Sequence, residues 1–174
     1  EELETLYKGQ WSNGKLPHIV YHTEKNTYCP GPDFWQVESA DGVKTSGISN
    51  PPVTAIAVRK IVEKARDKKL AFEKTKLLFP KIYHWHSWWH TKRDPYQTGL
   101  VSSFHPWETG RDNSHDWRDA MANVPIDGLE PYHRKDTSMV PIDERPSPRD
   151  YDVFMKLVQN SRRLGYNDEK LFDN

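Results

Sequence analysis

A run of apolar residues at helical spacing, from Leu70 to His90, determines the fold class more firmly than any other segment of the chain. An amphipathic helix repeats its apolar face every three to four residues, and the apolar positions here are Leu70, Phe72, Leu77, Leu78, Ile82, Trp85 and Trp89. The run predicts a long helix that ends at Arg93-Asp94-Pro95. Pro80 lies inside it. Because proline removes a backbone hydrogen bond, we expect a kink or the start of a new helix at that point.

Two further helices are expected, one on each side of this run. Pro51-Pro52 can open a first turn, and the residues that then follow helical spacing are Val53, Ile56, Ala57, Lys60 and Ile61. Ser147 is a good N-cap for a helix from Pro148 to Leu164, with Gly165 as its C-cap. The apolar stripe of that helix is Tyr151, Phe154, Met155 and Val158.

Shorter helical pieces are expected within 1–10 and 113–123, and Asn167 could cap a last helix. Residues 11–50 show no sustained period and are rich in glycine and proline, so they predict long loops. Such a long irregular segment is unusual in a compact domain unless it is functional. Helices joined by long loops, with few strand signals, predict an all-α fold.

The composition limits the classes of partner. The 174 residues suit one domain and include 25 basic and 25 acidic side chains. A net charge of zero argues against nucleic acid or an anionic membrane as the partner, because both usually require a basic field. No run approaches the roughly 18 apolar residues of a membrane span. The single cysteine, Cys29, excludes an intramolecular disulfide.

The ends and the aromatic content carry weaker information. The chain begins with Glu1 rather than Met and ends soon after the expected cap Asn167, so we expect a piece of a longer protein. The oligomeric state stays open, as does the compartment, with the cytoplasm favoured. Seven tryptophans, eight tyrosines and six phenylalanines suit either a sugar site or a small aromatic core.

The stretch from His105 to Trp117 has the residue types that a sugar-cleaving site requires. It holds three carboxylates, two tryptophans and a glycine within 13 residues. A carboxyl group can protonate a glycosidic oxygen, an aromatic face can pack on a sugar ring, and glycine lets backbone come close. Asp112 is the candidate general acid, since Trp107 and Trp117 could form apolar walls that raise its pKa. The alternative is that Asp112 caps the helix expected at 113–123.

Glu108 lies four residues before Asp112, and two carboxylates suggest an acid and a base. In an inverting hydrolase the two carboxyl groups lie about 6.5–9.5 Å apart, on opposite faces of the sugar. Two groups on one loop seldom reach both faces, so we expect Glu108 to order the loop instead.

Metal and nucleophile chemistry have less support. His86 and His90 are four residues apart and would share a helix face, with His84 nearby. The residues between them lack the glutamate of a metalloprotease motif, so we interpret all three as ordinary helix histidines and assign no metal. No general base is placed beside Cys29, and the glycine spacing matches neither a phosphate loop nor a dinucleotide motif.

Five stretches carry a family resemblance, and they are Gly9 to His18, Tyr28 to Trp35, Thr45 to Pro52, His105 to Trp117 and Arg134 to Thr137. In order and spacing they resemble the (α/α)6-barrel domain of glycoside hydrolase family 63, in the branch of mannosylglycerate and glucosylglycerate hydrolases. The resemblance extends along nearly all 174 residues. It implies an all-α, partial (α/α)6 barrel with long irregular loops, in which 1–174 is a single incomplete catalytic-domain fragment.

The resemblance also implies roles for particular residues. In this family the aspartate of the Trp-x-x-Gly-x-Asp-Asn-Ser stretch is the general acid, and it falls on Asp112. Trp107 and Gly110 of the same stretch would lie at the sugar subsite. The family is inverting and its base is a glutamate much later in the domain, so no residue here is assigned as base. This acid–base chemistry requires no metal and no organic cofactor.

Two positions depart from the family pattern. Asn50 replaces the usual glutamine, so a sugar contact could be lost or made through water. Arg111 stands where methionine is common. A cation there would lower the pKa of Asp112, or it could point outward and bind an anionic aglycone such as glycerate. Trp11 is a further candidate to pack on the sugar ring.

These features predict an inverting glycosidase for α-linked glucose or mannose, with glucosylglycerate or mannosylglycerate as candidate substrates and a small carbohydrate as partner. Without a base, the fragment alone would be inactive. Two alternatives stay open: a noncatalytic carbohydrate-binding or scaffold module, and a zinc-binding helical protein. Half a barrel would also expose apolar helix faces, so we expect the isolated fragment to aggregate or stay loosely packed.

Overall fold

The computed structural model describes residues 1–23, 28–138 and 140–173. Its α-helices are α1 (Glu2–Leu6), α2 (Pro32–Trp35), α3 (Thr54–Lys64), α4 (Lys68–Lys92), α5 (Arg118–Ala122), α6 (Pro148–Arg163) and α7 (Asp168–Phe172). Short 3-10 helices occupy Tyr7–Gly9, Pro106–Thr109, His115–Trp117, Asp136–Ser138 and Ile142–Glu144. Over these ranges there is no strand, and β-pairing is limited to isolated bridges. The all-α prediction is confirmed.

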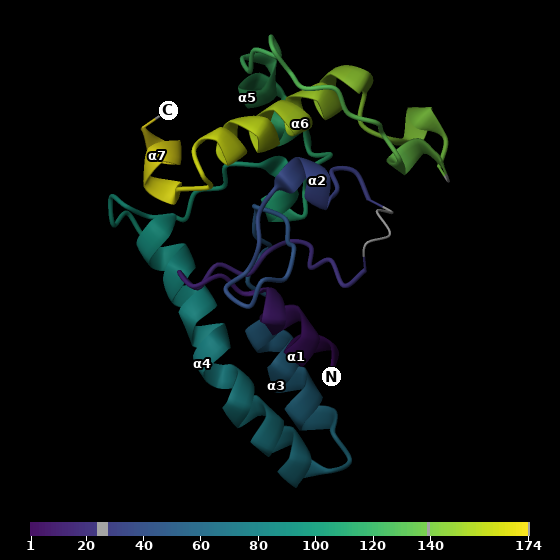
Figure 1. Cartoon of the computed structure of the whole chain (residues 1–174). Coiled ribbons are helices and arrows are strands. Elements are labelled where there is room, and N and C mark those ends of the chain that lie inside the picture. The colour runs from purple at the N-terminus through teal and green to yellow at the C-terminus, as the bar shows by residue number, and fades with distance from the viewer. Residues whose placement is uncertain (24–27, 139, 174) are drawn as a thin grey trace.

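The helices are arranged in two groups (Figure 1). Helices α3 and α4 form a hairpin with α1 beside it, while α2, α5, α6 and α7 gather at the other end of the molecule. The irregular segments between them lie in the middle. None of the described helices is long and apolar enough to cross a membrane.

Helix α4 runs unbroken through Pro80, so the alternative of a new helix starting there is wrong. Leu78, before the proline, and Ile82, after it, are both buried. Packing on both sides outweighs the single hydrogen bond that proline removes. At the start of the helix, the side chain of Asp67 accepts from the Leu70 N–H at 2.9 Å.

Helix α3 begins at Thr54, later than the proline pair that was expected to open it. A tight turn occupies the prolines, because the Val53 N–H donates to the Pro51 carbonyl at 2.8 Å. Pro51 is itself followed by a proline, and that position disfavours helical backbone. The expected opening by Pro51-Pro52 is therefore wrong.

Helix α6 confirms the local signals for both of its ends. Ser147 and Asp150 form a reciprocal capping box at its start. Gly165, just after its end, has φ of 64°, the left-handed conformation that favours glycine. All four residues of the predicted stripe are buried, namely Tyr151, Phe154, Met155 and Val158. The predicted Asn167 cap of α7 is also present.

Residues 11–23 and 28–50 form an ordered layer rather than free loops. Their backbone is held by the isolated bridges Pro17 with Ser49 and Val20 with Thr45. Gly47 is required here because an added Cβ would lie 2.0 Å from the ring of Tyr166. This layer packs under α6 through a cluster of Trp35, Ile48, Val158 and Tyr166.

The α3–α4 hairpin leaves a large apolar surface uncovered. Seven of its large apolar side chains are more than half exposed: Ile56, Ile61, Leu70, Phe72, Leu77, Phe79 and Tyr83. Several belong to the faces that the sequence pattern predicted to be apolar. Extensive exposed apolar surface often marks a face that is covered by protein.

A polypeptide of residues 1–174 alone should therefore bind an apolar dye and lack a sharp thermal transition, because the hairpin exposes its apolar face. Dye fluorescence and calorimetry measure both properties, with the full-length protein as control. A cooperative transition with no dye binding would contradict this prediction.

Candidate active site

His105 anchors the start of the stretch from His105 to Trp117. It is fully buried, its Nε2 lies 3.0 Å from the Phe154 carbonyl, and its Nδ1 accepts from the Trp107 N–H at 3.1 Å. Burial lowers the pKa of His105 to about 4. The ring is therefore neutral, with the proton on Nε2. Sequence analysis missed this residue because its partner Phe154 lies in α6, 49 positions along the chain.

Glu108 is buried and fully engaged, as expected for a residue that orders the loop. Its carboxylate accepts two hydrogen bonds from Arg93, at 2.7 and 2.8 Å, and one each from the backbone N–H groups of Ser49 and Phe104. Burial raises the pKa of Glu108, but the Arg93 charge and these donors outweigh it and hold the pKa below its usual value. The prediction that Glu108 orders the loop is confirmed.

Arg93 extends this contact into a buried ion network. Its Nε donates to the Asp168 carboxylate at 3.0 Å, and the side chains of Arg93 and Asp168 are 2% and 3% exposed. The indole of Trp88 donates to the other oxygen of Asp168 at 3.0 Å. Glu108, Arg93 and Asp168 thus join the 105–117 loop, the end of α4 and the start of α7.

Lys15 adds a second buried cation next to this network. Its Nζ donates to the Gly47 carbonyl at 3.0 Å and lies 3.8 Å from the ring centre of Trp11. Burial lowers the pKa of Lys15 to about 8, while the charge of Asp168 acts in the opposite direction. Two cations and two carboxylates therefore balance in this part of the interior.

Asp112 differs from Glu108 in both burial and hydrogen bonding. It is partly exposed, and its carboxylate accepts no hydrogen bond from any residue that the structure describes. It lines a cavity of about 610 Å³ together with Trp107, Gly110 and His18. The alternative that Asp112 caps the next helix is wrong, since Ser114 caps it by accepting from the Asp116 N–H.

Gly110 forms the backbone turn that leads to Asp112 at the cavity. Its φ is 67°, a left-handed conformation that glycine adopts without strain. The turn ends the short helix Pro106–Thr109 and directs the chain along the cavity. Trp107 lies on the same wall, with its ring 4.5 Å from that of His105 and 5.2 Å from that of Phe154.

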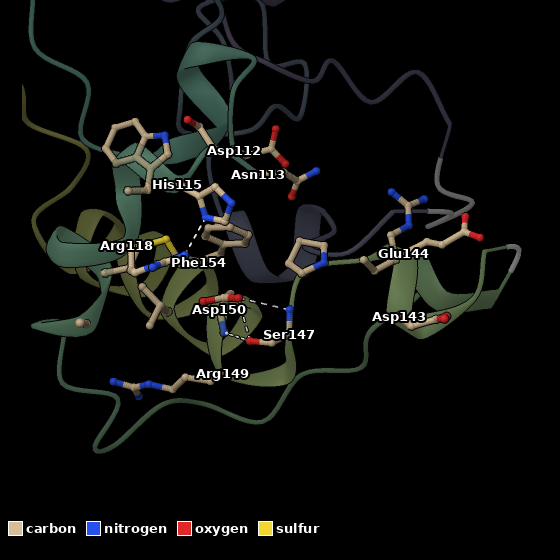
Figure 2. Close-up of a pocket in the computed structure, with 17 residues that line it drawn as sticks. Asp112, Asn113, His115, Arg118, Asp143, Glu144, Ser147, Arg149, Asp150 and Phe154 are labelled. Carbon is tan, nitrogen blue, oxygen red and sulfur yellow. Dashed lines mark hydrogen bonds between the residues drawn. The ribbon is translucent and has the colours of Figure 1, made fainter.

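A second cavity, of about 730 Å³, shares Asp112 and Arg145 with the first. Figure 2 shows it between the Asp112 segment, the 3-10 helix with Asp143 and Glu144, and the start of α6. Its lining carries both signs of charge, from Asp112, Arg118, Asp143, Glu144, Arg145, Arg149 and Asp150. The two cavities place Asp112 and Arg145 on a common boundary.

A second carboxylate on the first cavity is already paired. Asp136 accepts two hydrogen bonds from Arg134, at 2.8 and 2.7 Å. These bonds are the main reason that the pKa of Asp136 is lowered. The Arg134 guanidinium in turn lies 4.3 Å from the ring centre of Tyr151 in α6. This pair fixes the cavity wall and keeps Asp136 ionised.

Three predicted substrate-binding residues lie outside the Asp112 cavity. Asn50 donates to the carbonyl of His18, which lines the Asp112 cavity, at 3.4 Å. Trp11 donates to the Thr45 hydroxyl and lines a separate cavity of about 320 Å³. The Arg111 guanidinium is 70% exposed and pairs with Asp116 at 2.7 Å rather than with Asp112. The structure brings together Asp112, Trp107 and Gly110 of the predicted set.

The histidines of the zinc alternative give no support for a metal site. His84 and His90 are exposed, His86 is half-buried, and no described group of His, Cys, Asp or Glu could hold a metal ion. Cys29 lines the Asp112 cavity, and burial raises the pKa of its thiol, which favours the unreactive protonated form.

Replacing Glu108 by Gln in the full-length protein should destabilise it by about 3–5 kcal/mol, because Arg93 would keep its buried charge without its main partner. Chemical denaturation measures this difference. Glu73→Gln is the matched control, since Glu73 is exposed on α4. Equal stability of the two variants would contradict the role of the network.

Comparisons with known proteins identify the family of the chain. A family model described as the mannosylglycerate hydrolase MGH1-like glycoside hydrolase domain matches residues 1–174. The chain is 47% identical over 173 residues to mannosylglycerate hydrolase MGH1 of Selaginella moellendorffii. It is 37% identical over 181 residues to the glucosylglycerate hydrolase of Mycolicibacterium hassiacum. These alignments cover 99% and 98% of this chain, but 35% and 41% of the relatives.

A solved structure confirms the fold. The structure is of the glycoside hydrolase family 63 mannosylglycerate hydrolase from Thermus thermophilus, in complex with Tris and D-glycerate. It superposes with a TM-score of 0.92 at 43% identity, covering 99% of this chain and 41% of that one. The predicted partial (α/α) barrel is confirmed by this match. The chain belongs to the family of mannosylglycerate hydrolase MGH1-like glycoside hydrolase domains.

Proposed function

We propose that this chain supplies the acid half of the active site of an inverting glycoside hydrolase. The substrates would carry α-linked glucose or mannose, with glucosylglycerate and mannosylglycerate as the leading candidates. The observation that carries the proposal is the free carboxylate of Asp112 in a cavity beside Trp107 and Gly110, in a member of this family.

The activities named for the relatives support this substrate class. Relatives that match nearly the whole chain are named mannosylglycerate and glucosylglycerate hydrolases. Solved structures of the Thermus thermophilus relative are described in complex with D-glycerate and with glucose. The chain spans about 35–42% of the length of these curated relatives, so the activity of the whole protein is inferred.

In the proposed mechanism Asp112 protonates the glycosidic oxygen as the bond breaks. Trp107 would pack on the sugar ring, and the backbone at Gly110 would approach its hydroxyl groups. Acid–base catalysis of this type requires no metal and no organic cofactor.

The base that activates water has to be a different carboxylate. Glu108 is committed to Arg93, and Asp136 is committed to Arg134. Both oxygens of Glu108 accept two hydrogen bonds each, and both oxygens of Asp136 accept one from the Arg134 guanidinium. Because the family resemblance implies a glutamate base much later in the domain, we infer that the base lies outside the 174 residues and that this chain is one part of a larger catalytic domain.

Arg145 is better placed than Arg111 to bind an anionic aglycone. Arg145 lines both cavities that meet at Asp112, whereas Arg111 lines neither and pairs with Asp116. A guanidinium binds a carboxylate through two parallel hydrogen bonds. In this arrangement the sugar would occupy the cavity of Trp107, and an acidic aglycone would lie toward Arg145.

In the full-length protein, Asp112→Asn should lower kcat about 100- to 10,000-fold on glyceryl α-glucosides or α-mannosides, since the amide cannot donate an acidic proton. Sugar binding should survive. Turnover of a panel of α-glucosides, α-mannosides and glyceryl glycosides is the measurement.

Asp116→Asn is the matched control, because Asp116 lies on the same loop and is exposed. Turnover that does not depend on Asp112 would contradict the proposal. Binding without any turnover would favour a noncatalytic carbohydrate-binding module instead.

A further inference from the structure

His18 lines the same cavity as Asp112 and has no part in the mechanism so far. Its backbone is fixed on both sides: its N–H donates to the Ile48 carbonyl at 2.8 Å, and its carbonyl accepts from Asn50 at 3.4 Å. The ring Nδ1 is enclosed and has no hydrogen-bond partner among the described residues. An enclosed ring nitrogen without a partner restricts which nitrogen can carry the proton.

The ring is neutral near pH 7. Burial lowers the pKa of His18, and the nearby charges of Asp112 and Glu108 oppose this only in part. A neutral imidazole carries one N–H, on Nδ1 or on Nε2. The choice between them decides what the ring can offer to a ligand.

The surroundings favour the proton on Nε2. An N–H enclosed without an acceptor costs about 1–3 kcal/mol, and orphaned buried N–H groups are rarer than orphaned acceptors. Nδ1 is enclosed, whereas Nε2 is not among the enclosed unpartnered atoms and makes no bond to the described residues. The N–H therefore lies on Nε2, the nitrogen that a ligand can reach.

His105 provides an internal comparison. Its two nitrogens are both engaged, by the Phe154 carbonyl and by the Trp107 N–H. It is a structural histidine with nothing left to offer a ligand. His18, in contrast, lines the Asp112 cavity with an unused donor.

We propose that His18 contacts the substrate, donating a hydrogen bond from Nε2 to a hydroxyl oxygen of the sugar bound beside Asp112. The inference rests on the proposed function, because it concerns the same cavity. It adds a specificity-determining residue: a fixed neutral donor that recognises one hydroxyl of a polyhydroxylated ligand. Asn50 then positions His18 from behind, through its carbonyl.

Two amide variants of the full-length protein distinguish the role of Nε2 of His18 from that of Nδ1. His18→Gln carries its amide nitrogen near the place of Nε2, and His18→Asn carries it near Nδ1. We expect His18→Ala and His18→Asn to lower kcat/KM on the best glycoside by roughly tenfold to a hundredfold, the loss expected for one substrate hydrogen bond. His18→Gln should recover most of the loss, and all three should melt within a few degrees of wild type.

Monodeoxy substrates add a readout that a purely structural role would not change. One deoxy analogue should be a poor substrate of the wild type and lose nothing further in His18→Ala. Equal activity of His18→Gln and His18→Asn, or the same loss in His18→Ala for every deoxy analogue, would overturn the inference.

Binding of glucose and mannose, measured by calorimetry, keeps this test separate from the proposed function. If the wild type turns over no glycoside, the proposed function fails. Weaker binding by His18→Ala, restored in His18→Gln, would still support the contact. Unchanged affinity for both sugars in His18→Ala would overturn it.

Discussion

Arg93 holds two buried carboxylates, Glu108 and Asp168, and this ion network fixes the candidate site in space. Its members come from the end of α4, the 105–117 loop and the start of α7, up to 75 positions apart. Removing either carboxylate would leave an uncompensated charge in the interior, which is strongly unfavourable. The loop that carries Asp112 is therefore anchored four residues before its free carboxylate.

The site contains side chains whose hydrogen-bonding atoms are all paired, and others whose atoms are not. Glu108 has every oxygen occupied, whereas Asp112 accepts no hydrogen bond from the described residues. His105 is satisfied at both nitrogens, whereas His18 is not. Asp112 and His18, which keep unpaired polar atoms, both line the cavity. This arrangement is expected where a ligand completes the hydrogen bonding.

Local sequence signals predicted what depends on neighbouring residues. The capping box at Ser147 and the spacing of apolar residues place α6 and α4 correctly, because both act within a few turns. The roles of Arg93 and His105 could not be predicted, because Arg93 pairs with Asp168, 75 positions away, and His105 contacts Phe154, 49 positions away. Comparison with the family pattern also nominated Trp11 and Arg111, but the fold places both outside the Asp112 cavity. The assignment of Asp112 as acid came from family resemblance, and the cavity is consistent with it.

The decisive measurement compares leaving groups in the full-length protein. A glycoside with a very acidic leaving group, such as a dinitrophenyl glycoside, requires little protonation, whereas a glyceryl glycoside requires it fully. If Asp112 is the acid, the loss of kcat in Asp112→Asn should be large for the glyceryl substrate and nearly vanish for the dinitrophenyl one. Glu108→Gln should lose the same factor on both. An equal loss on both substrates in Asp112→Asn would show that Asp112 does not donate the proton.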